Sequence, residues 1–293
     1  MPELPEVETI RRDLADAVVG RRIIAVRVWR RAGIRNGTSA SQVPPGGRIW
    51  QQRLDGRVTD RDLGRLSGRV IHAIARRGKY LLFDVGDSDA LMIHLGMTGS
   101  IGLSDPATEP DKHAFLGLRL DDGRELRLSD PRGFGEARPL SADEIRALEG
   151  RLGPEPLSHE FSADYLAGQF ARRSALIKGL LLNQSIVAGL GNIYVDEALW
   201  MAQVHPERRA NTLTRHEVEA LGRAVVQVLT EAIERRGTTF SDFRDLYGRR
   251  GDNGPSLRVF HRAEEPCPRC GGPIQLIRVS GRGSSVCPAC QAK

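Results

Sequence analysis

Four cysteines constrain the fold of this 293-residue chain more tightly than any other feature. They form two CxxC pairs, Cys267 with Cys270 and Cys287 with Cys290, and all lie within the last 27 residues. The 16 residues between the pairs include four glycines. Two CxxC knuckles at this separation are typical of a tetrahedral zinc site with four thiolate ligands. Because four thiolates leave no open coordination position, the sequence predicts one structural Zn²⁺.

A disulfide framework is the alternative for the same cysteines. The chain has no other cysteine, and its N-terminal region lacks the apolar core of a secretory signal peptide. With no export signal, we expect the protein to be cytoplasmic. Disulfides are rare in the reducing cytoplasm, so we expect the four cysteines to bind zinc. The segment 259–293 is too short to bury a core, and we expect the metal to hold it folded.

Length and composition limit the remaining possibilities. A chain of 293 residues is long enough for two domains, and its 40% hydrophobic content is typical of a globular protein. No apolar run approaches the roughly 20 residues that span a bilayer, so no membrane partner is expected. The net charge of +6 and the isoelectric point near 9.5 favour a polyanionic partner.

The first half of the chain alternates between strand-like segments and turns. Residues 3–19 are predicted to form a leading helix, since Val7, Ile10, Leu14 and Val18 share one face. Strand-like segments begin at Ile23, Val70 and Ala90, and a loop is expected over 33–47. The stretch FLGLRLDDGRELRLSD predicts a hairpin, because alternating leucines flank an Asp-Asp-Gly turn. Residues 1–140 are therefore predicted to form a sheet-rich domain.

The second half is helical after a linker at LGPEPLS, residues 152–158. Helices are predicted around 163–172, 175–183, 192–201 and 214–236, within a domain that spans 152–258. The turn SIVAGLGN contains Gly189, Gly191 and Asn192. Two explanations stay open for it: an ordinary helical hairpin, or a loop whose N–H groups bind a phosphate oxygen.

The N-terminal MPELPEVE raises a chemical possibility. Removal of Met1 would leave Pro2 with a free secondary amine, and α-amino groups titrate near pH 7.7–8.0 in model peptides. A fraction of such an amine is unprotonated and can attack carbonyl-type carbons. The alternative is that Pro2 only begins a helix whose first turn is acidic, and this stretch alone favours that explanation.

Three further features of the first half could bind nucleic acid. Lys79 follows Arg76 and Arg77 at the start of an apolar strand, where it could protect a strand edge or contact phosphate. Met97 lies at a glycine-flanked strand end. Arg132 and Phe134 share a tight loop, and an exposed arginine beside an aromatic ring can pair with a base edge and wedge a base step apart. Packing explains each singly, whereas together they indicate one DNA groove.

The motifs occur in an order that resembles bacterial formamidopyrimidine-DNA glycosylase (the Fpg/MutM family). They are PELPEVETIRR, RRGKYLL, IHLGMTGS, KHAF, DPRGFG, LGPEPL, GLGNIYVDEAL and CPRC followed by GRGSSVCPAC. The resemblance covers nearly the whole chain. It implies an α+β fold with two domains: an N-terminal β-sandwich with flanking helices, and a helix-two-turn-helix module followed by a four-cysteine zinc-finger β-hairpin.

The resemblance also implies an activity and residues that perform it. The family excises oxidised purines such as 8-oxoguanine and formamidopyrimidines, and then cleaves the strand as an AP lyase by β,δ-elimination. By this match Pro2 is the nucleophile that forms a Schiff base, Glu3 is the general acid/base, and Glu6 supports it. Lys79 matches a lysine of phosphate contact and elimination chemistry, and Arg282 matches the zinc-finger arginine of the final elimination.

Other residues match DNA contacts of the family. Met97, Arg132 and Phe134 match the residues that fill the gap left by a flipped nucleotide, with Arg132 reading the orphaned cytosine. Extruding a base costs a few kcal/mol, so a filler stabilises the open duplex. Contacts with the DNA backbone are implied for His113, Arg173, Lys178 and Asn192. The implied partner is double-stranded DNA with oxidised bases or abasic sites, bound by a nucleoid-associated monomer.

The chain departs from the family pattern at three places, and two alternative functions stay open. Gly133 stands where the family usually has a second arginine, Phe115 where it has a polar residue, and residues 246–262 lack an obvious match to its lesion-recognition loop. One alternative is the oxidised-pyrimidine branch, endonuclease VIII, against which Leu4 argues. The other is a non-catalytic DNA-binding relative, against which the joint presence of the four candidate catalytic residues argues.

Overall fold

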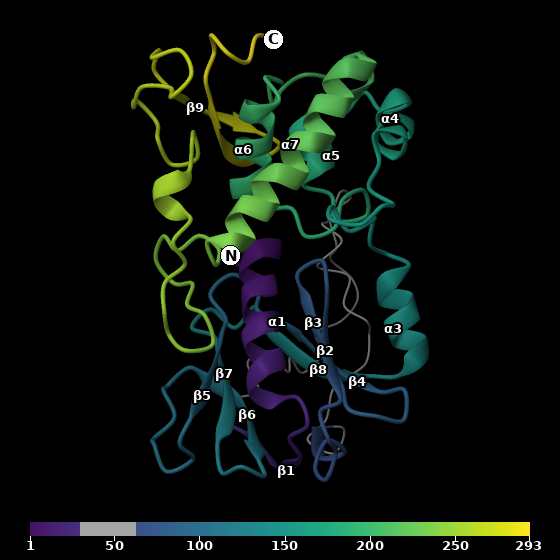
Figure 1. Cartoon of the computed structure of the whole chain (residues 1–293), viewed down its shortest axis with the longest axis vertical. Coiled ribbons are helices and arrows are strands. Elements are labelled where there is room, and N and C mark those ends of the chain that lie inside the picture. The colour runs from purple at the N-terminus through teal and green to yellow at the C-terminus, as the bar shows by residue number, and fades with distance from the viewer. Residues whose placement is uncertain (30–62) are drawn as a thin grey trace, which may run out of the picture. The chain divides into compact units, whose positions relative to one another are not determined.

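The computed structural model describes residues 1–29 and 63–293, which divide into two compact units (Figure 1). The first unit comprises Met1–Pro2, Glu6–Gly150 and Thr238–Gly251. The second comprises Glu3–Pro5, Arg151–Gly237 and Asp252–Lys293. The loop expected over 33–47 lies outside the described residues.

The first unit is a β-sandwich with helices, as the resemblance implied. Its strands are β1 (Ile23–Val28), β2 (Ala73–Arg77), β3 (Tyr80–Asp84), β4 (Ala90–His94), β5 (Ser100–Ser104), β6 (Ala114–Leu120), β7 (Glu125–Ser129) and β8 (Glu136–Leu140). They form two antiparallel sheets, ordered β1-β6-β7-β5 and β2-β3-β4-β8. Helix α1 (Leu4–Val18) precedes them and α3 (Ala142–Glu149) follows, begun by a capping box of Ser141 and Glu144.

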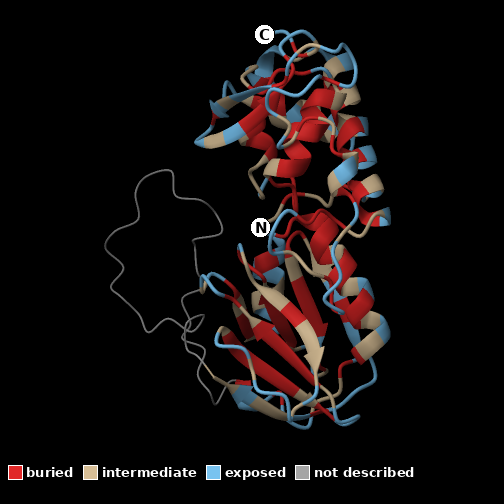
Figure 2. Ribbon diagram, turned by 90° about the vertical axis from the view of Figure 1, so that its left-hand side faces the viewer, coloured by how far each residue is buried: buried red, intermediate tan, exposed pale blue. Residues whose placement is uncertain are grey.

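One hydrophobic core joins α1 to both sheets. The apolar face of α1 predicted from the sequence is buried in it, together with inward residues such as Phe83 and Leu91 of one sheet and Leu118 and Leu128 of the other. Figure 2 shows these strands mostly as buried. The predicted hairpin is confirmed, since β6 and β7 pair across the turn at Asp121–Gly123.

The second unit combines helices with a two-stranded hairpin. Its elements are α4 (Ala163–Ala171), α5 (Ile177–Leu181), α6 (Asn192–Met201), η2 (Ala210–Thr212), α7 (Arg215–Glu234), η3 (Gly254–Ser256), β9 (Gln275–Val279) and β10 (Arg282–Val286). Helix α6 is buried from Ile193 to Trp200, and α7 packs against it. No helix of residues 1–29 and 63–293 is both long and apolar enough to cross a membrane.

Residues 238–251 belong to the first unit, although the sequence pattern grouped them with the helices of 152–258. Leu246 is 2% exposed and lies in the core of the sandwich. The N–H of Thr238 donates to the buried carboxylate of Glu6 at 2.7 Å. These contacts explain why the segment packs with the strands rather than with α7.

Candidate functional site

Two loops of the first unit lie against each other backbone to backbone. One follows β4 and carries Met97, and the other follows β7 and carries Arg132 and Phe134. A Cβ on Gly96 would lie 2.6 Å from the carbonyl carbon of Phe134, so a larger residue would push the loops apart. Met97 is 37% and Phe134 47% exposed, and the Arg132 guanidinium lies 5.1 Å from the centre of the Phe134 ring. The structure thus brings these three predicted residues together on two joined loops.

Asp130 ties the two loops to each other. Its Oδ1 accepts from Oγ1 of Thr98 at 2.6 Å and from the N–H of Arg132 at 3.1 Å, and Oδ2 accepts from the N–H of Gly135 at 2.6 Å. The N–H of Asp130 donates to the carbonyl of His113 at 3.0 Å. The buried residue Asp130 therefore holds the loop of Arg132 beside the loop of Met97 and beside His113. Asp130 was missed from the sequence, although it stands inside the DPRGFG motif.

The structure accounts for two departures from the family pattern. Gly133 has a φ of 65°, a conformation that costs other residues about 1–2 kcal/mol, so glycine leaves this loop unstrained. Phe115 is 7% exposed and belongs to the sandwich core. It is a packing residue in β6.

Lys79 lies in the tight turn between β2 and β3 and is only 7% exposed. The next residue, Tyr80, pairs with His94 of β4, and their rings are 4.8 Å apart. Burial, and then the positive charge of Lys79, lower the pKa of His94 to about 4. The imidazole is therefore neutral near pH 7. We therefore add His94 to the candidate site beside Lys79. Their proximity follows from the pairing of β3 with β4, in which Tyr80 lies opposite His94, and the sequence did not show this register.

The N-terminal residues Pro2 and Glu3 are both buried, whereas Met1 is 43% exposed. Pro2 belongs to the first unit and Glu3 to the second, so the chain changes from one unit to the other at this peptide bond. The Glu3 carboxylate accepts from the N–H of Ile193 at 3.1 Å and more weakly from that of Tyr194 at 3.5 Å. The anion at the N-terminus of α6 is therefore Glu3 itself.

The polar backbone groups of the glycine turn before α6 form hydrogen bonds with Gln184 and Leu4. Oε1 of Gln184 accepts from the N–H of Gly189, and Nε2 donates to the carbonyl of Leu190, both at 2.8 Å. The carbonyl of Gly189 accepts from the N–H of Leu4 at 3.1 Å. Of the two explanations left open for this turn, the helical hairpin agrees with these contacts.

Lys178, for which the resemblance implies a DNA-backbone contact, lies inside the second unit. It is fully buried, and its Nζ donates to Oδ1 of Asp196 at 2.6 Å and to the carbonyl of Gly283 at 2.8 Å. Burial lowers the pKa of Lys178, while burial raises the pKa of Asp196 to about 6. In this structure Lys178 contacts the interior of the second unit rather than solvent.

The other DNA-contact candidates of the second unit are accessible to different degrees. Arg173 follows α4 and is exposed. Asn192, the first residue of α6, is partly buried, and its Nδ2 donates to the carbonyl of Gly283 at 3.0 Å. Arg282 begins β10 after the Ser280–Gly281 turn and is partly exposed. Asn192 and Arg282 thus meet at the same hairpin.

The four cysteines form the predicted metal centre. All are free thiols, and their sulfur atoms lie within 4.8 Å of one another. The Cys267–Cys290 and Cys270–Cys287 sulfur distances are 3.9 and 3.5 Å, against about 3.8 Å for a tetrahedron with zinc–sulfur bonds of about 2.3 Å. The set fits one structural Zn²⁺. Zinc, when bound, cross-links the knuckles and supplies folding energy.

The first knuckle also contacts the C-terminal end of α6. Nε1 of Trp200 donates to the sulfur of Cys267 at 3.3 Å. Although burial opposes ionisation, the N–H groups of Arg269 and Cys270 and the Trp200 indole lower the pKa of Cys267 to about 6, which favours the thiolate. The Arg269 guanidinium lies 4.2 Å from the Trp200 ring and donates to the carbonyls of Trp200 and Met201. The zinc finger therefore caps this helix.

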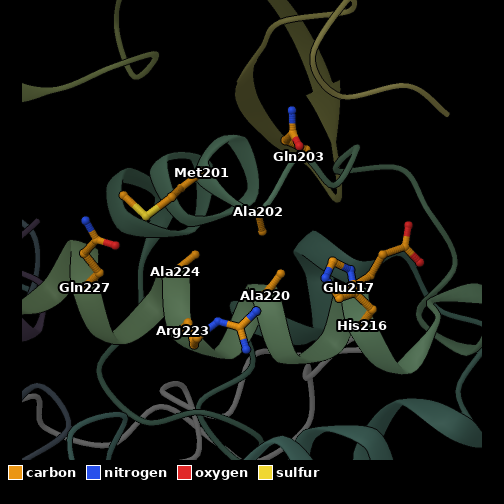
Figure 3. Close-up of a pocket in the computed structure, with 9 residues that line it drawn as sticks. All are labelled: Met201, Ala202, Gln203, His216, Glu217, Ala220, Arg223, Ala224 and Gln227. Atoms are coloured by element: carbon orange, nitrogen blue, oxygen red, sulfur yellow. The ribbon is translucent and has the colours of Figure 1, made fainter. Parts of the chain in front are cut away.

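A hollow of about 430 Å³ lies between the C-terminal end of α6 and α7 (Figure 3). Its lining includes Gln203, His216, Arg223 and Gln227. None of the residues predicted from the sequence lines it, so the candidate chemistry lies elsewhere.

Three family models match successive parts of the chain. The formamidopyrimidine-DNA glycosylase N-terminal domain matches residues 1–137, and the H2TH domain of the same enzyme matches 152–244. A zinc finger found in FPG and IleRS matches 264–293.

Known proteins match over the full length. A formamidopyrimidine-DNA glycosylase of Herpetosiphon aurantiacus is 42% identical, with 100% of both chains covered. One of Symbiobacterium thermophilum is 45% identical over 99% of this chain and 89% of its own length. The crystal structure of a mutant Lactococcus lactis Fpg with Fapy-dG-containing DNA is 34% identical and has a TM-score of 0.87, with 100% of both chains covered. A complex of Lactococcus lactis Fpg with abasic-site DNA has a TM-score of 0.86 at 35% identity, over 99% of this chain and 100% of that one.

The sandwich, the helical module and the zinc finger agree with all three models, and this agreement defines the class of the protein. It is a DNA-binding repair enzyme, a DNA glycosylase with AP lyase activity. Identity and coverage then identify the family. The chain belongs to the formamidopyrimidine-DNA glycosylase family.

Proposed function

We propose that this enzyme excises oxidised purines, 8-oxoguanine and formamidopyrimidines, from duplex DNA and cleaves the strand through a proline Schiff base. The observation that carries the proposal is the fixed carboxylate of Glu3, the chain neighbour of Pro2. Two N–H groups of α6 hold it, and it is 3% exposed. A carboxylate held beside a candidate nucleophile is suited to proton transfer during the reaction.

The steps follow from the chemistry of a secondary amine. After loss of Met1, the Pro2 nitrogen bonds to C1′ of the damaged nucleotide and the base leaves. Glu3 moves protons about the opening sugar, and Glu6 supports it. The resulting iminium carries a fixed positive charge, because a secondary amine has no second N–H to lose. It acidifies the C2′ proton, and the 3′ phosphate leaves by β-elimination. Lys79 and Arg282 bind phosphates, and Arg282 assists the final δ-elimination.

Two groups of residues are proposed to hold the substrate DNA. Met97, Arg132 and Phe134 fill the vacated base stack, and their joined, exposed loops support this role. His113, Arg173 and Asn192 contact the DNA backbone. For Lys178 we propose a structural role in place of a DNA contact, because it is fully buried. We further propose that the protein acts as a monomer on nucleoid DNA in the cytoplasm.

Borohydride trapping tests the proposal. The purified protein is incubated with duplexes that carry 8-oxoguanine, formamidopyrimidine, 5-hydroxycytosine or an abasic site. We expect a covalent adduct that is lost in Pro2→Gly or when Met1 is retained, and kept in the matched control Pro5→Ala. Strand cleavage with no adduct would contradict the lyase mechanism. The pyrimidine substrate is included because a Lactococcus lactis Fpg structure contains oxidised-pyrimidine DNA. A preference for it would favour the endonuclease VIII alternative.

A further inference from the structure

Two buried, oppositely charged side chains join α5, α6 and the zinc hairpin. Besides its bond to Lys178, Asp196 accepts from the backbone N–H of Ser285 at 2.9 Å and from Oγ of Ser284 at 3.3 Å. Lys178 reaches the same strand, β10, at the carbonyl of Gly283. Both partners of the ion pair therefore bind β10 as well as each other.

These contacts meet at the residue after Arg282. The Gly283 carbonyl accepts from Lys178 at 2.8 Å and from Nδ2 of Asn192 at 3.0 Å. On the other side of Arg282, a Cβ on Gly179 would lie 2.8 Å from Oγ of Ser280, so the backbone of α5 lies close to the hairpin turn. The backbone next to Arg282 is therefore held by hydrogen bonds at Gly283, and the turn before Arg282 lies close to α5.

Stability is a weak explanation for this arrangement. Lys178 is 0% and Asp196 1% exposed, and taking two charges out of water offsets most of the attraction between them. Apolar residues of similar volume would stabilise such a site at least as well. A buried ion pair with directed bonds to backbone groups instead fixes one geometry.

We propose that the Asp196–Lys178 pair is a positioning device for Arg282. It fixes the Arg282–Gly283 backbone in the second unit, so that the guanidinium is placed for the phosphate that leaves in δ-elimination. This inference rests on the proposed function, since it requires that the enzyme eliminates phosphates with the help of Arg282. Asp196 and Lys178 act through Arg282 and do not touch the DNA.

The ratio of δ- to β-elimination products on abasic-site DNA tests this role. Asp196→Asn leaves a donor group facing the N–H of Ser285, and Ser284→Ala removes one hydroxyl while the ion pair stays. We expect Asp196→Asn to lower the δ:β ratio by roughly 10-fold, because a misplacement of about 1 Å can reduce a rate about a hundredfold. Ser284→Ala should lower it less. Borohydride trapping at Pro2 should persist in both.

Glu197→Gln is the matched control. Glu197 is the next residue of α6 and equally buried, but it accepts from the N–H groups of Arg258, Val259 and Phe260 and not from the hairpin. It should reduce thermal stability and leave the δ:β ratio unchanged. In an Arg282→Ala background, Asp196→Asn should cause no further fall.

Three results would overturn the inference: an unchanged ratio in both Asp196→Asn and Ser284→Ala, an equal fall in Glu197→Gln, or an additional fall in the Arg282→Ala background. Ser284→Ala decides the matter if Asp196→Asn does not fold. Failure of the proposed function is distinguishable, because the unaltered enzyme would then give no trapped adduct. Zinc content is measured throughout, and we expect it to stay at one equivalent.

Discussion

Gly191→Ala offers a way to displace the Glu3 carboxylate without altering Glu3. A Cβ on Gly191 would lie 2.2 Å from Cδ and 2.4 Å from Oε1 of Glu3, so the two side chains cannot share the space. The backbone of Gly191 is extended, with φ −139° and ψ −164°, a conformation that alanine also adopts. The substitution should therefore move the carboxylate while leaving the turn itself unstrained.

The hydrogen bonds that the displaced Glu3 carboxylate would lose determine how far the free energy of unfolding should fall. A hydrogen bond to a charged group contributes about 1.5–3 kcal/mol, and a carboxylate at a helix N-terminus adds about 0.3–1 kcal/mol. The second bond, at 3.5 Å, contributes little. The free energy of unfolding should thus fall by about 2–4 kcal/mol. If Glu3 is the general acid/base, base excision should slow by about 10²–10⁴-fold.

The assay is single-turnover release of 8-oxoguanine, with denaturant unfolding measured in parallel. Gly222→Ala in α7 is the control, because its Cβ would meet only Leu166, at an ordinary 3.4 Å. This control should excise at the unaltered rate. Excision at the unaltered rate by Gly191→Ala, despite a loss of stability, would refute the role assigned to the Glu3 carboxylate.

Four further outcomes are expected. Chelation of zinc, or Cys287→Ser, should abolish DNA binding in a gel-shift assay while near-ultraviolet circular dichroism of the sandwich persists; simultaneous loss of both would contradict a separate zinc-held segment. Asp130→Ala should reduce discrimination between cytosine and adenine opposite the lesion, since it frees the loops of Met97 and Arg132; unchanged discrimination would count against a positioning role. Gly133→Ala should lower the free energy of unfolding by about 1–2 kcal/mol through its positive φ, and no loss in denaturant titration would refute the strain. The pKa of His94 is lowered from 6.5 to about 4, so the unfolded chain binds its proton first and stability should fall as the pH drops from about 6.5 towards 4. His94→Gln should flatten this decline, and an identical pH profile would refute it.

The elements with a clear period were predictable from the sequence. The helix expected over 3–19 is α1, Leu4–Val18, and the helices expected around 192–201 and 214–236 are α6 and α7. Strands β5 and β8 were missed, because SIGLS and EARPL are short and carry a glycine and a proline. Each lies at the edge of its sheet, where such residues are tolerated. Helix α3 was missed although its Ser141–Glu144 capping box is visible.

Burial was the part of the candidate site that the sequence did not reveal. The resemblance implied a DNA-backbone contact for Lys178, yet this lysine lies in the interior, where Asp196, 18 positions away, neutralises its charge. Likewise, the sequence did not show that a carboxylate lies at the start of α6, where the N–H of Ile193 binds Glu3 from 190 positions earlier in the chain. Both outcomes depend on long-range contacts, which local residue patterns do not encode.

Peptide mapping of the borohydride-trapped complex tests the central claim most directly. The enzyme is trapped on abasic-site DNA, digested with trypsin, and the peptide that carries the sugar remnant is sequenced by mass spectrometry. We predict that the remnant is attached to the nitrogen of Pro2 in a peptide that lacks Met1. A remnant on Lys79 or any other lysine, with the N-terminal peptide unmodified, would contradict the account.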